Sequence, residues 1–415
     1  MRIGLIGEKL GHSFSKPIHE ALADYTYELI PLAKDEFAPF MEQRDFQAIN
    51  VTIPYKQDVI AYCDVVDERA RAIGAVNTIV QREGKLFGYN TDFDGFLYMA
   101  ERHGIDFLNK KILILGTGGT RKTITAVAKS QGVREILIAS RGAKEGTISY
   151  EQCKEHPDVE IIINASPQGM YPNNGTCLID LADFPQCTAV MDVVYNPLKT
   201  ALLLQAEERG IQAINGLEML VAQAKYAAEY FAGRPIAQEE IDRIYQSLRM
   251  DLSNIVLIGM PSAGKTTLGR RLSKRLGKTF VDADERLVSE QKRSIPDIFA
   301  QGGETLFREI EADVIARIGK ETGQVIATGG GVIKRGANMR ALRQNGLVIF
   351  LDRDCRRLMT DPNRPLSSSP AAIEQMYRER RPLYERYSDL HVLNNGNPKQ
   401  TLMEMEKQIH AYFGH

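Results

Sequence analysis

The residues whose spacing is most specific for a chemistry lie at 259–267, GMPSAGKTT, directly after an apolar run. Gly259, Gly264, Lys265 and Thr266 hold the fixed positions of the pattern G-x-x-x-x-G-K-[ST]. In such a loop the glycines let the backbone wrap a polyphosphate, the lysine reaches the terminal phosphates, and the threonine holds magnesium. A helical run, LGRRLSKRLG, follows the loop. The segment therefore predicts a site for a nucleoside triphosphate and Mg²⁺.

Acidic, glycine and arginine residues after this loop predict what the nucleotide acts on. Asp282 and Asp284 end a short apolar run, so their carboxylates lie on the same side of an extended chain. One carboxylate suits magnesium and the other suits a substrate hydroxyl. Alternatively, the two residues only cap the helix that follows. The glycines at 329–331 would let a small ligand lie against bare backbone. Several arginines of the last third are expected to stabilise a transferred phosphoryl group, with a solvated basic face as the alternative: Arg353, Arg356, Arg357, Arg364, Arg378, Arg380, Arg381 and Arg386.

Four polar clusters interrupt the apolar segments of the first hundred residues. They read GHSFS from Gly11, NVTIPYK from Asn50, AVNT from Ala75 and YNTD from Tyr89. Taken singly, such residues are usually found in turns and caps. Together they offer hydroxyls, amides, one lysine and one aspartate, which suits a small polyhydroxylated ligand.

A second glycine-rich turn follows the apolar run at 110–115. It contains Gly116, Thr117, Gly118, Gly119 and Thr120, and a helical run follows it. This order is typical of a dinucleotide-binding sheet, in which an acidic residue at the end of the second strand binds the ribose of NAD. Here that strand ends in Ser140 and Arg141, with Lys144 nearby. A basic end suits the additional phosphate of NADP, and an ordinary surface arginine is the alternative.

Composition sets limits on the class of protein. The chain of 415 residues is long enough for two or three domains, and its net charge of −1 gives no global field for nucleic acid or anionic membranes. No apolar run is long enough to span a bilayer, and the N-terminal run is too short for a signal peptide. The five cysteines are scattered without a C-x-x-C pair, which is typical of a cytoplasmic protein. The oligomeric state stays open.

The elements that must position these residues alternate along the chain. We expect strands at 2–6 and 48–53 and helices at 17–24 and 59–73 in the first hundred residues. Strands then follow at 110–115, 135–139, 159–164, 189–194 and 211–214, and helices at 216–231 and 238–248. The last part repeats the alternation, with strands at 255–258, 279–281, 324–327, 347–351 and 390–393. Such alternation is typical of α/β folds with parallel sheets.

The first 249 residues resemble the shikimate dehydrogenase family. The matching segments are GHSFS, NVTIPYK, GAVNT, NTD, GTGGT, YNP and NGLEMLVAQA. The resemblance implies that Lys56 and Asp92 are the catalytic pair and also contact the substrate. It implies that the remaining substrate contacts come from Ser13, Ser15, Thr52, Asn77, Tyr195 and Gln223, and that Glu68, Val193 and Gly216 lie beside the nicotinamide of NADP(H). Departures are Lys16 in place of proline, Glu20 in place of asparagine, and SRGAKE in place of N-R-T with a later arginine.

Residues from 254 almost to the C-terminus resemble the shikimate kinase family. The matching segments are GMPSAGKTT, FVDADERL, IFAQGGETLFREIE, ATGGG, NRPL and ERRPLYE. The resemblance implies that ATP is held by Ser262, Ala263, Gly264, Lys265, Thr266, Thr267 and Arg357, and by Arg364 in a lid at 360–369. It also implies that Thr266 and Asp282 hold Mg²⁺ and that Asp284, Arg308, Gly330 and Arg380 bind shikimate, with Lys265 and Asp284 in catalytic roles.

These observations predict an α/β protein with a substrate domain, a Rossmann-type NADP domain and a P-loop kinase domain. We expect the substrate domain at 1–100 plus 216–249, the NADP domain at 101–215, a linker at 250–253 and the kinase at 254–415. The predicted function is NADPH-dependent reduction of 3-dehydroshikimate followed by Mg-ATP-dependent phosphorylation of shikimate. The alternatives are a dehydrogenase that uses quinate, or an inactive dehydrogenase-like module that scaffolds the kinase.

Overall fold

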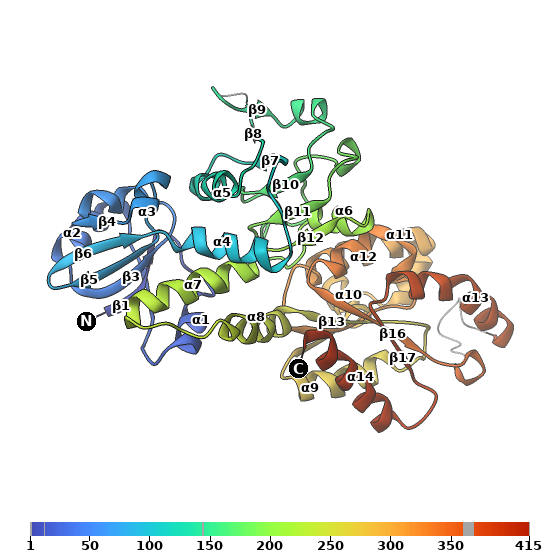
Figure 1. Cartoon of the computed structure of the whole chain (residues 1–415). Coiled ribbons are helices and arrows are strands. Elements are labelled where there is room, and N and C mark those ends of the chain that lie inside the picture. The colour runs from blue at the N-terminus through green and yellow to red at the C-terminus, as the bar shows by residue number, and fades with distance from the viewer. Residues whose placement is uncertain (1, 12, 143–144, 360–368, 415) are drawn as a thin grey trace. The chain divides into compact units, whose positions relative to one another are not determined.

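The computed structural model describes residues 2–11, 13–142, 145–359 and 369–414. Within these residues the strands form three sheets (Figure 1). The chain divides into two compact units. The first comprises Met1–Gln168, Cys177–Tyr195 and Gln205–Tyr245, and the second comprises Gly169–Thr176, Asn196–Leu204 and Gln246–His415. The boundary falls inside helix α8 (Glu239–Leu252), so residues 250–252 of the expected linker are helical.

The first sheet belongs to the N-terminal part of the first unit. Its strands are β1 (Arg2–Gly7), β2 (Glu28–Pro31), β3 (Phe46–Val51), β4 (Val65–Val66), β5 (Thr78–Arg82) and β6 (Lys85–Tyr89), in the order β2-β1-β3-β5-β6-β4. Strand β5 runs antiparallel to β3 and β6, and the other pairs are parallel. The helices of this part are α1 (Ser15–Leu22), α2 (Lys34–Gln43), η1 (Asp58–Tyr62), α3 (Glu68–Ile73) and α4 (Thr91–Arg102).

The helix expected at 59–73 is wrong. The chain forms the short η1, then β4, then α3. Val65 and Val66 pair in parallel with Phe87 and Gly88 of β6, which draws this segment into the sheet. Asp67 then starts a new helix, because its side chain accepts hydrogen bonds from two backbone N–H groups of α3.

The second sheet is parallel throughout, as the alternation of strands and helices predicts. Its strands are β7 (Lys111–Leu115), β8 (Glu135–Ser140), β9 (Ile148–Ser149), β10 (Ile161–Asn164), β11 (Ala189–Asp192) and β12 (Gln212–Ile214), in the order β12-β11-β10-β7-β8-β9. The helices are α5 (Gly119–Ser130), η2 (Gln152–Glu155), η3 (Leu181–Asp183), α6 (Ala201–Glu208) and α7 (Leu217–Ala232).

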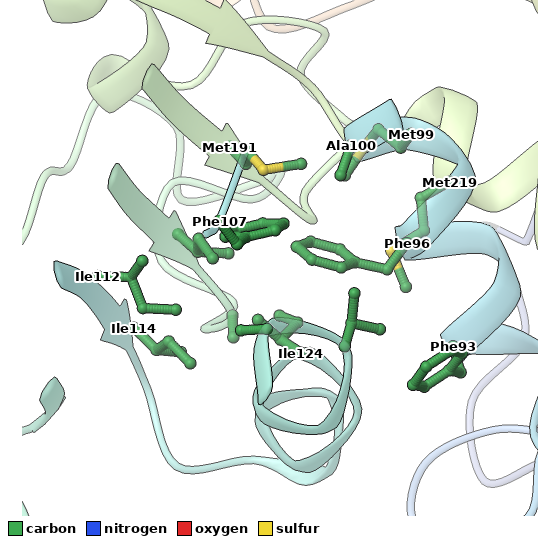
Figure 2. Close-up of a cluster of buried hydrophobic side chains, with 14 of the residues drawn as sticks. Phe93, Phe96, Met99, Ala100, Phe107, Ile112, Ile114, Ile124, Met191 and Met219 are labelled. Atoms are coloured by element: carbon green, nitrogen blue, oxygen red, sulfur yellow. The ribbon is translucent and has the colours of Figure 1, made fainter. Parts of the chain in front are cut away.

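Helix α4 connects the two sheets of the first unit through a shared core. Helices α4 and α7 pack along each other (Figure 1). Phe96 of α4 is fully buried against Phe107, and Figure 2 shows both rings between the isoleucines of β7 and α5 and the methionines of β11 and α7. Because interiors are close-packed, this cluster fixes α4 relative to the second sheet. The side chains at the start of α4 are therefore held in place relative to that sheet.

The third sheet lies in the second unit and is also parallel. Its strands are β13 (Asn254–Ile258), β14 (Thr279–Asp282), β15 (Gln324–Ala327), β16 (Gly346–Asp352) and β17 (Leu390–Leu393), in the order β14-β15-β13-β16-β17. Its helices are α9 (Lys265–Leu276), α10 (Ala283–Gln291), α11 (Ile295–Ile318), η4 (Val332–Lys334), α12 (Gly336–Arg343), η5 (Cys355–Arg357), α13 (Pro370–Tyr387) and α14 (Pro398–Phe413). The expected α/β fold class is confirmed in all three sheets. Among the described residues, none of the helices has the length and hydropathy needed to cross a membrane.

Candidate active sites

Lys56 and Asp92 form the centre of the first site. Lys56 Nζ lies 2.6 Å from Asp92 Oδ2, and the two side chains are only 20% and 11% exposed. Asp92 is in the first turn of α4, where Asn90 caps the helix by accepting a hydrogen bond from the Phe93 N–H. The Lys56 carbonyl accepts a hydrogen bond from the Val76 N–H at 2.8 Å. An ammonium and a carboxylate are thus preset as a pair, an arrangement that can hold and deliver a proton.

Asn77 connects this pair to helix α7. Its Oδ1 accepts from the Thr91 N–H at 2.7 Å, next to Asp92, and its Nδ2 lies 3.5 Å from Gln223 Oε1. A Cβ at Gly95 would lie 2.8 Å from the Gln223 Cβ, so only glycine lets α7 come this close to α4. Two polar residues 146 positions apart are therefore neighbours.

The serines of the first polar cluster lie at the start of α1. Ser13 Oγ lies 3.1 Å from Ser15 Oγ and also accepts a hydrogen bond from the Ser15 N–H. The ring of the intervening Phe14 meets Tyr195 edge to face, with centroids 5.8 Å apart. Burial raises the pKa of the Tyr195 phenol, which keeps it protonated as a hydrogen-bond donor. Thr52 directly follows β3, and its methyl group would lie 2.5 Å from a Cβ at Gly7.

The glycines predicted to bind the dinucleotide follow strands of the second sheet. Gly116 has φ +108°, and a Cβ there would lie 2.9 Å from the Ser166 Cβ. At Gly118 and Gly119 a Cβ would meet nothing within 4 Å, so the N-terminus of α5 is open to an incoming anion. A Cβ at Gly216 would lie 2.2 Å from the Val193 carbonyl oxygen, which places these two predicted residues together.

The remaining residues predicted for NADP differ in how far the structure describes them. Thr117 and Thr120 lie on the same turn, Thr117 exposed and Thr120 half-buried. Ser140 ends β8 and is buried, whereas Arg141 beside it is exposed. Lys144 lies outside the described residues. Glu68 is exposed on the first turn of α3, and its role stays a prediction.

The phosphate-binding loop has the backbone that its sequence predicts. Ser262 and Gly264 both have positive φ, at +62° and +98°, and α9 begins directly after the loop. The buried Lys265 donates from Nζ to the carbonyl oxygens of Gly259 and Met260, at 2.9 and 2.8 Å. The chain thus folds a loop whose N–H groups and lysine are arranged for a polyphosphate. Ala263 is fully buried within it, and Thr267 follows Thr266 on the first turn of α9.

Asp282 has the helix-capping role considered for it, and its magnesium role stays a prediction. Its Oδ1 caps α10 by accepting from the N–H groups of Asp284 and Glu285, at 3.0 and 3.3 Å. Its Oδ2 accepts from the Thr266 hydroxyl at 2.7 Å. A hydroxyl and a carboxylate are oxygen ligands of the kind that Mg²⁺ binds, so the residues present fit this ion.

The glycines at 329–331 pack against side chains of the same site. A Cβ added at Gly329 would lie 2.9 Å from an Asp284 carboxylate oxygen. One at Gly330 would lie 2.7 Å from Pro261, and one at Gly331 would lie 2.2 Å from the Arg308 guanidinium. The bare backbone therefore makes room for the predicted binding residues. Arg380, which is 7% exposed, completes the group by donating to the Gly330 carbonyl at 3.0 Å.

Arg308 is held by two carboxylates. Its Nη1 donates to both Glu311 oxygens, at 3.0 and 2.8 Å, and its Nη2 lies 3.1 Å from Glu304. Burial raises the pKa of Glu311, and the Arg308 charge offsets part of that rise. Sequence reasoning named Arg308 but missed Glu311, although a spacing of three residues on a helix is a signal for such a pair.

Two further residues of the second unit were not found from the sequence. Asn394 Nδ2 donates to the Ala263 carbonyl at 2.8 Å, and a Cβ at Gly264 would lie 2.7 Å from the same nitrogen. The Tyr384 hydroxyl donates to the Gly330 carbonyl at 2.5 Å. Both residues hold a loop of the site from a distant element, and no local sequence pattern indicates them.

Arg357 donates to the Asn395 carbonyl, whereas Arg364 and the expected lid, apart from Ser369, lie outside the described residues.

Comparison with known proteins finds two similarities, one in the N-terminal part of the chain and one in the C-terminal part. The family model for the shikimate dehydrogenase substrate binding domain matches residues 5–79, and the model for shikimate kinase matches residues 261–410. Shikimate dehydrogenase (NADP(+)) of Clostridium perfringens is 34% identical over 264 residues, which cover 59% of this chain and 97% of that protein.

Solved structures give the same result for the first part. Shikimate dehydrogenase 1 of Peptoclostridium difficile is 34% identical, with a TM-score of 0.55 over 60% of this chain and 98% of that one. A Thermus thermophilus shikimate 5-dehydrogenase in complex with NADP(H) and shikimate is 26% identical, with a TM-score of 0.54 over 60% of this chain and 99% of that one.

Proposed function

The chain belongs to the shikimate dehydrogenase family and carries a shikimate kinase domain in its C-terminal part, and from this premise we propose how its residues carry out both reactions. The protein is a bifunctional enzyme of the shikimate pathway. It reduces 3-dehydroshikimate with NADPH and phosphorylates the shikimate formed with ATP and Mg²⁺. The observation that carries this proposal is the presence of a preset charge pair in one site and a phosphate-binding loop facing a carboxylate-binding group in the other.

In the dehydrogenase, Lys56 delivers the proton. NADPH supplies the hydride when bound at the glycine turn before α5. As the substrate carbonyl becomes an alkoxide, the Lys56 ammonium stabilises the charge and transfers its proton to that oxygen. Asp92, at 2.6 Å, keeps the ammonium in position throughout. Asn77 and Gln223 bind ring hydroxyls, and the two serines at the N-terminal end of α1, Ser13 and Ser15, bind the carboxylate.

The preference for NADP(H) follows from the end of β8. Arg141 is exposed at the position where an acidic residue would bind the ribose hydroxyls of NAD. A guanidinium there pairs with the 2′-phosphate that only NADP carries. Of the relatives named above, the Clostridium perfringens enzyme is described as an NADP(+) dehydrogenase and the Thermus thermophilus enzyme as a complex with NADP(H).

In the kinase, Asp284 acts on the accepting hydroxyl. ATP supplies the γ-phosphoryl group, and Mg²⁺ at Thr266 and Asp282 neutralises its charge when both are bound. Arg308 and Arg380 bind the shikimate carboxylate, which orients the ring so that one hydroxyl lies at Asp284. The Asp284 carboxylate accepts the proton of this hydroxyl as the hydroxyl oxygen attacks phosphorus. Lys265 holds the phosphates in line for the transfer.

We also propose a cytoplasmic location and small-molecule partners only. All five cysteines are free thiols, as expected in a reducing compartment. The two ligands of the pathway, 3-dehydroshikimate and shikimate, carry the carboxylate and hydroxyls that both sites are equipped to bind.

One experiment tests both activities in the intact protein. The purified enzyme is given 3-dehydroshikimate and NADPH, oxidation is followed at 340 nm by absorbance, ATP is then added, and the phosphorylated product is identified by mass. Lys56→Ala should abolish only the reduction, and Lys265→Ala only the phosphorylation. Each variant serves as the folding control for the other. A Lys56→Ala protein that oxidises NADPH at the normal rate would exclude the proposed first site.

A further inference from the structure

A chain of buried hydrogen bonds leads from strand β3 to Asn77. Asn50 of β3 is only 5% exposed and lies opposite Thr78 of β5 in the antiparallel pair. Its Nδ2 donates to the Asn77 carbonyl at 3.2 Å and to Thr78 Oγ1 at 3.1 Å. Because a backbone carbonyl can only accept, this contact fixes which end of the Asn50 amide carries the protons. Asn50 Oδ1 therefore accepts the 2.7 Å hydrogen bond that the Tyr27 hydroxyl donates.

The hydroxyl of Thr78 connects this chain to the side chain of Asn77. Thr78 is completely buried, and its oxygen accepts from Asn50, so its single proton is available to donate to Asn77 Oδ1 at 3.0 Å. The 3.1 Å hydrogen bond between the hydroxyls of Thr78 and Thr91 is then donated by Thr91. Thr91 Oγ1 in turn accepts from Asn77 Nδ2 at 3.1 Å. Every proton of these hydroxyls thus has an assigned acceptor.

These hydrogen bonds set the direction of the Asn77 amide. Its Oδ1 also accepts from the Thr91 N–H at 2.7 Å, and a backbone N–H can only donate. Asn77 Nδ2 is therefore turned toward Gln223, whose Oε1 lies at 3.5 Å. The Gln223 Nε2 donates to the Leu220 carbonyl at 2.9 Å, which leaves the Gln223 oxygen facing Asn77. A hydroxyl bound here would accept from Asn77 and donate to Gln223.

We propose that Thr78 is a positioning residue for substrate binding in the dehydrogenase, because its hydroxyl links Asn50 to Asn77 Oδ1 and keeps Asn77 Nδ2 turned toward the substrate. This inference rests on the proposed dehydrogenase function. The role of Thr78 is to orient Asn77 and not to touch the substrate. Burial raises the pKa of the Tyr27 phenol, so the far end of the chain of hydrogen bonds keeps its proton.

Loss of the Thr78 hydroxyl should affect the substrate and not the cofactor or the proton transfer. Asn77 Oδ1 would lose one of its donors, and an Asn50 proton would lose one of its acceptors. The Asn77 amide could then turn away from the direction in which it binds a substrate hydroxyl. The pair of Lys56 and Asp92 makes none of these hydrogen bonds, so the rate of reduction of bound substrate should not change.

The test compares Thr78→Val with Thr78→Ser in the full-length protein. Valine keeps the shape of threonine without the hydroxyl, and serine keeps the hydroxyl. For each variant, kcat and the KM values for 3-dehydroshikimate and for NADPH are measured in the reduction. Thr78→Ala is a second variant without the hydroxyl, so poor folding of the valine variant leaves the alanine variant to decide. Thr78→Val is also combined with Asn77→Ala, and kcat/KM is measured for the single and double variants.

We expect Thr78→Val to raise the KM for 3-dehydroshikimate about three- to tenfold, the effect of one neutral hydrogen bond. The kcat and the KM for NADPH should stay unchanged, and Thr78→Ser should restore the wild-type KM. In the Asn77→Ala background, Thr78→Val should lower kcat/KM no further, because two residues that act through one group are not additive.

Three results would overturn the inference. They are an unchanged KM for 3-dehydroshikimate in the variants without the hydroxyl, an equal rise in the KM for NADPH, and a full additional loss of kcat/KM in the double variant. If the wild-type protein reduces no 3-dehydroshikimate, the proposed function itself fails, which is a distinct result.

Discussion

His19 gives a stability prediction that the structure makes quantitative. It lies on α1, four residues after Ser15, and is completely buried. Its ring stacks on Tyr27 with centroids 4.1 Å apart, and its Nδ1 lies 2.7 Å from the Tyr25 hydroxyl. The Tyr27 hydroxyl donates to Asn50, which in turn donates to the Asn77 carbonyl. Asn77, which is predicted to bind the substrate, is thus connected through Asn50 and Tyr27 to a buried neutral imidazole.

The direction of the pH dependence follows from the depressed pKa of His19. Burial lowers this pKa from 6.5 to about 3, and a hydrogen bond with Asn50 opposes the shift to a smaller extent. Above pH 6.5 the imidazole is neutral in both states, so its contribution to stability is fully present. As the pH falls below 6.5, the unfolded chain binds a proton that the folded chain refuses, and stability is lost progressively down to about pH 3. At pH 5 the loss is about 2 kcal/mol, since each pH unit corresponds to about 1.4 kcal/mol.

The assay follows the loss of dehydrogenase activity on heating at pH 7.5 and at pH 5.0. A loss of 2 kcal/mol corresponds to a midpoint lower by about 4–8 °C in a unit of this size. His19→Phe keeps the stacked ring but cannot titrate. The thermal midpoint of this variant should therefore fall by about 4–8 °C less than that of the wild type between pH 7.5 and pH 5.0. Tyr25→Phe is the matched control, because it removes the same hydrogen bond and leaves His19 to titrate. Equal pH slopes for the wild type and His19→Phe would refute the reasoning.

Two further predictions concern the kinase. Glu311→Gln removes the buried charge that holds Arg308, so the KM for shikimate should rise about tenfold or more while the KM for ATP stays unchanged. Steady-state kinetics with each substrate varied will check this, and an equal rise in both constants would contradict it. Removal of Mg²⁺ with EDTA should abolish phosphorylation and leave NADPH oxidation intact, and Thr266→Ala should raise the Mg²⁺ concentration needed for half-maximal rate. The same Mg²⁺ titration curve for wild type and variant would exclude Thr266 as a ligand.

Contiguous motifs could be predicted from the sequence because their geometry is local. The phosphate-binding loop folds from nine adjacent residues. Its backbone has positive φ at Gly264, a conformation that the glycine in the sequence permits. The glycine turn before α5 and the strands of the two parallel sheets are likewise local patterns. The resemblance to two families added the roles of residues that lie far apart, and those roles stay predictions.

Other elements were missed because tertiary pairing decides them. A two-residue strand such as β4 has no period of its own, and its valines fit a helical pattern until they pair with β6. The hairpin of β5 and β6 was also missed, although its turn residues Glu83 and Gly84, with φ of +50° and +74°, form a pattern that favours a tight hairpin. The contact of Asn77, directly before β5, with Gln223 of α7 depends on tertiary packing, which spacing along the chain does not reveal.

The two lysines show why the sites differ in construction. Lys56 is paired with a carboxylate at 2.6 Å, whereas Lys265 is held by two backbone carbonyls. In the proposed reduction Lys56 releases a proton and must regain one before the next cycle, and Asp92 holds the ammonium in position. In the proposed phosphorylation Lys265 keeps its proton, and the two carbonyl oxygens orient its ammonium without adding a negative charge. These partners of the two lysines fit the two proposed reactions.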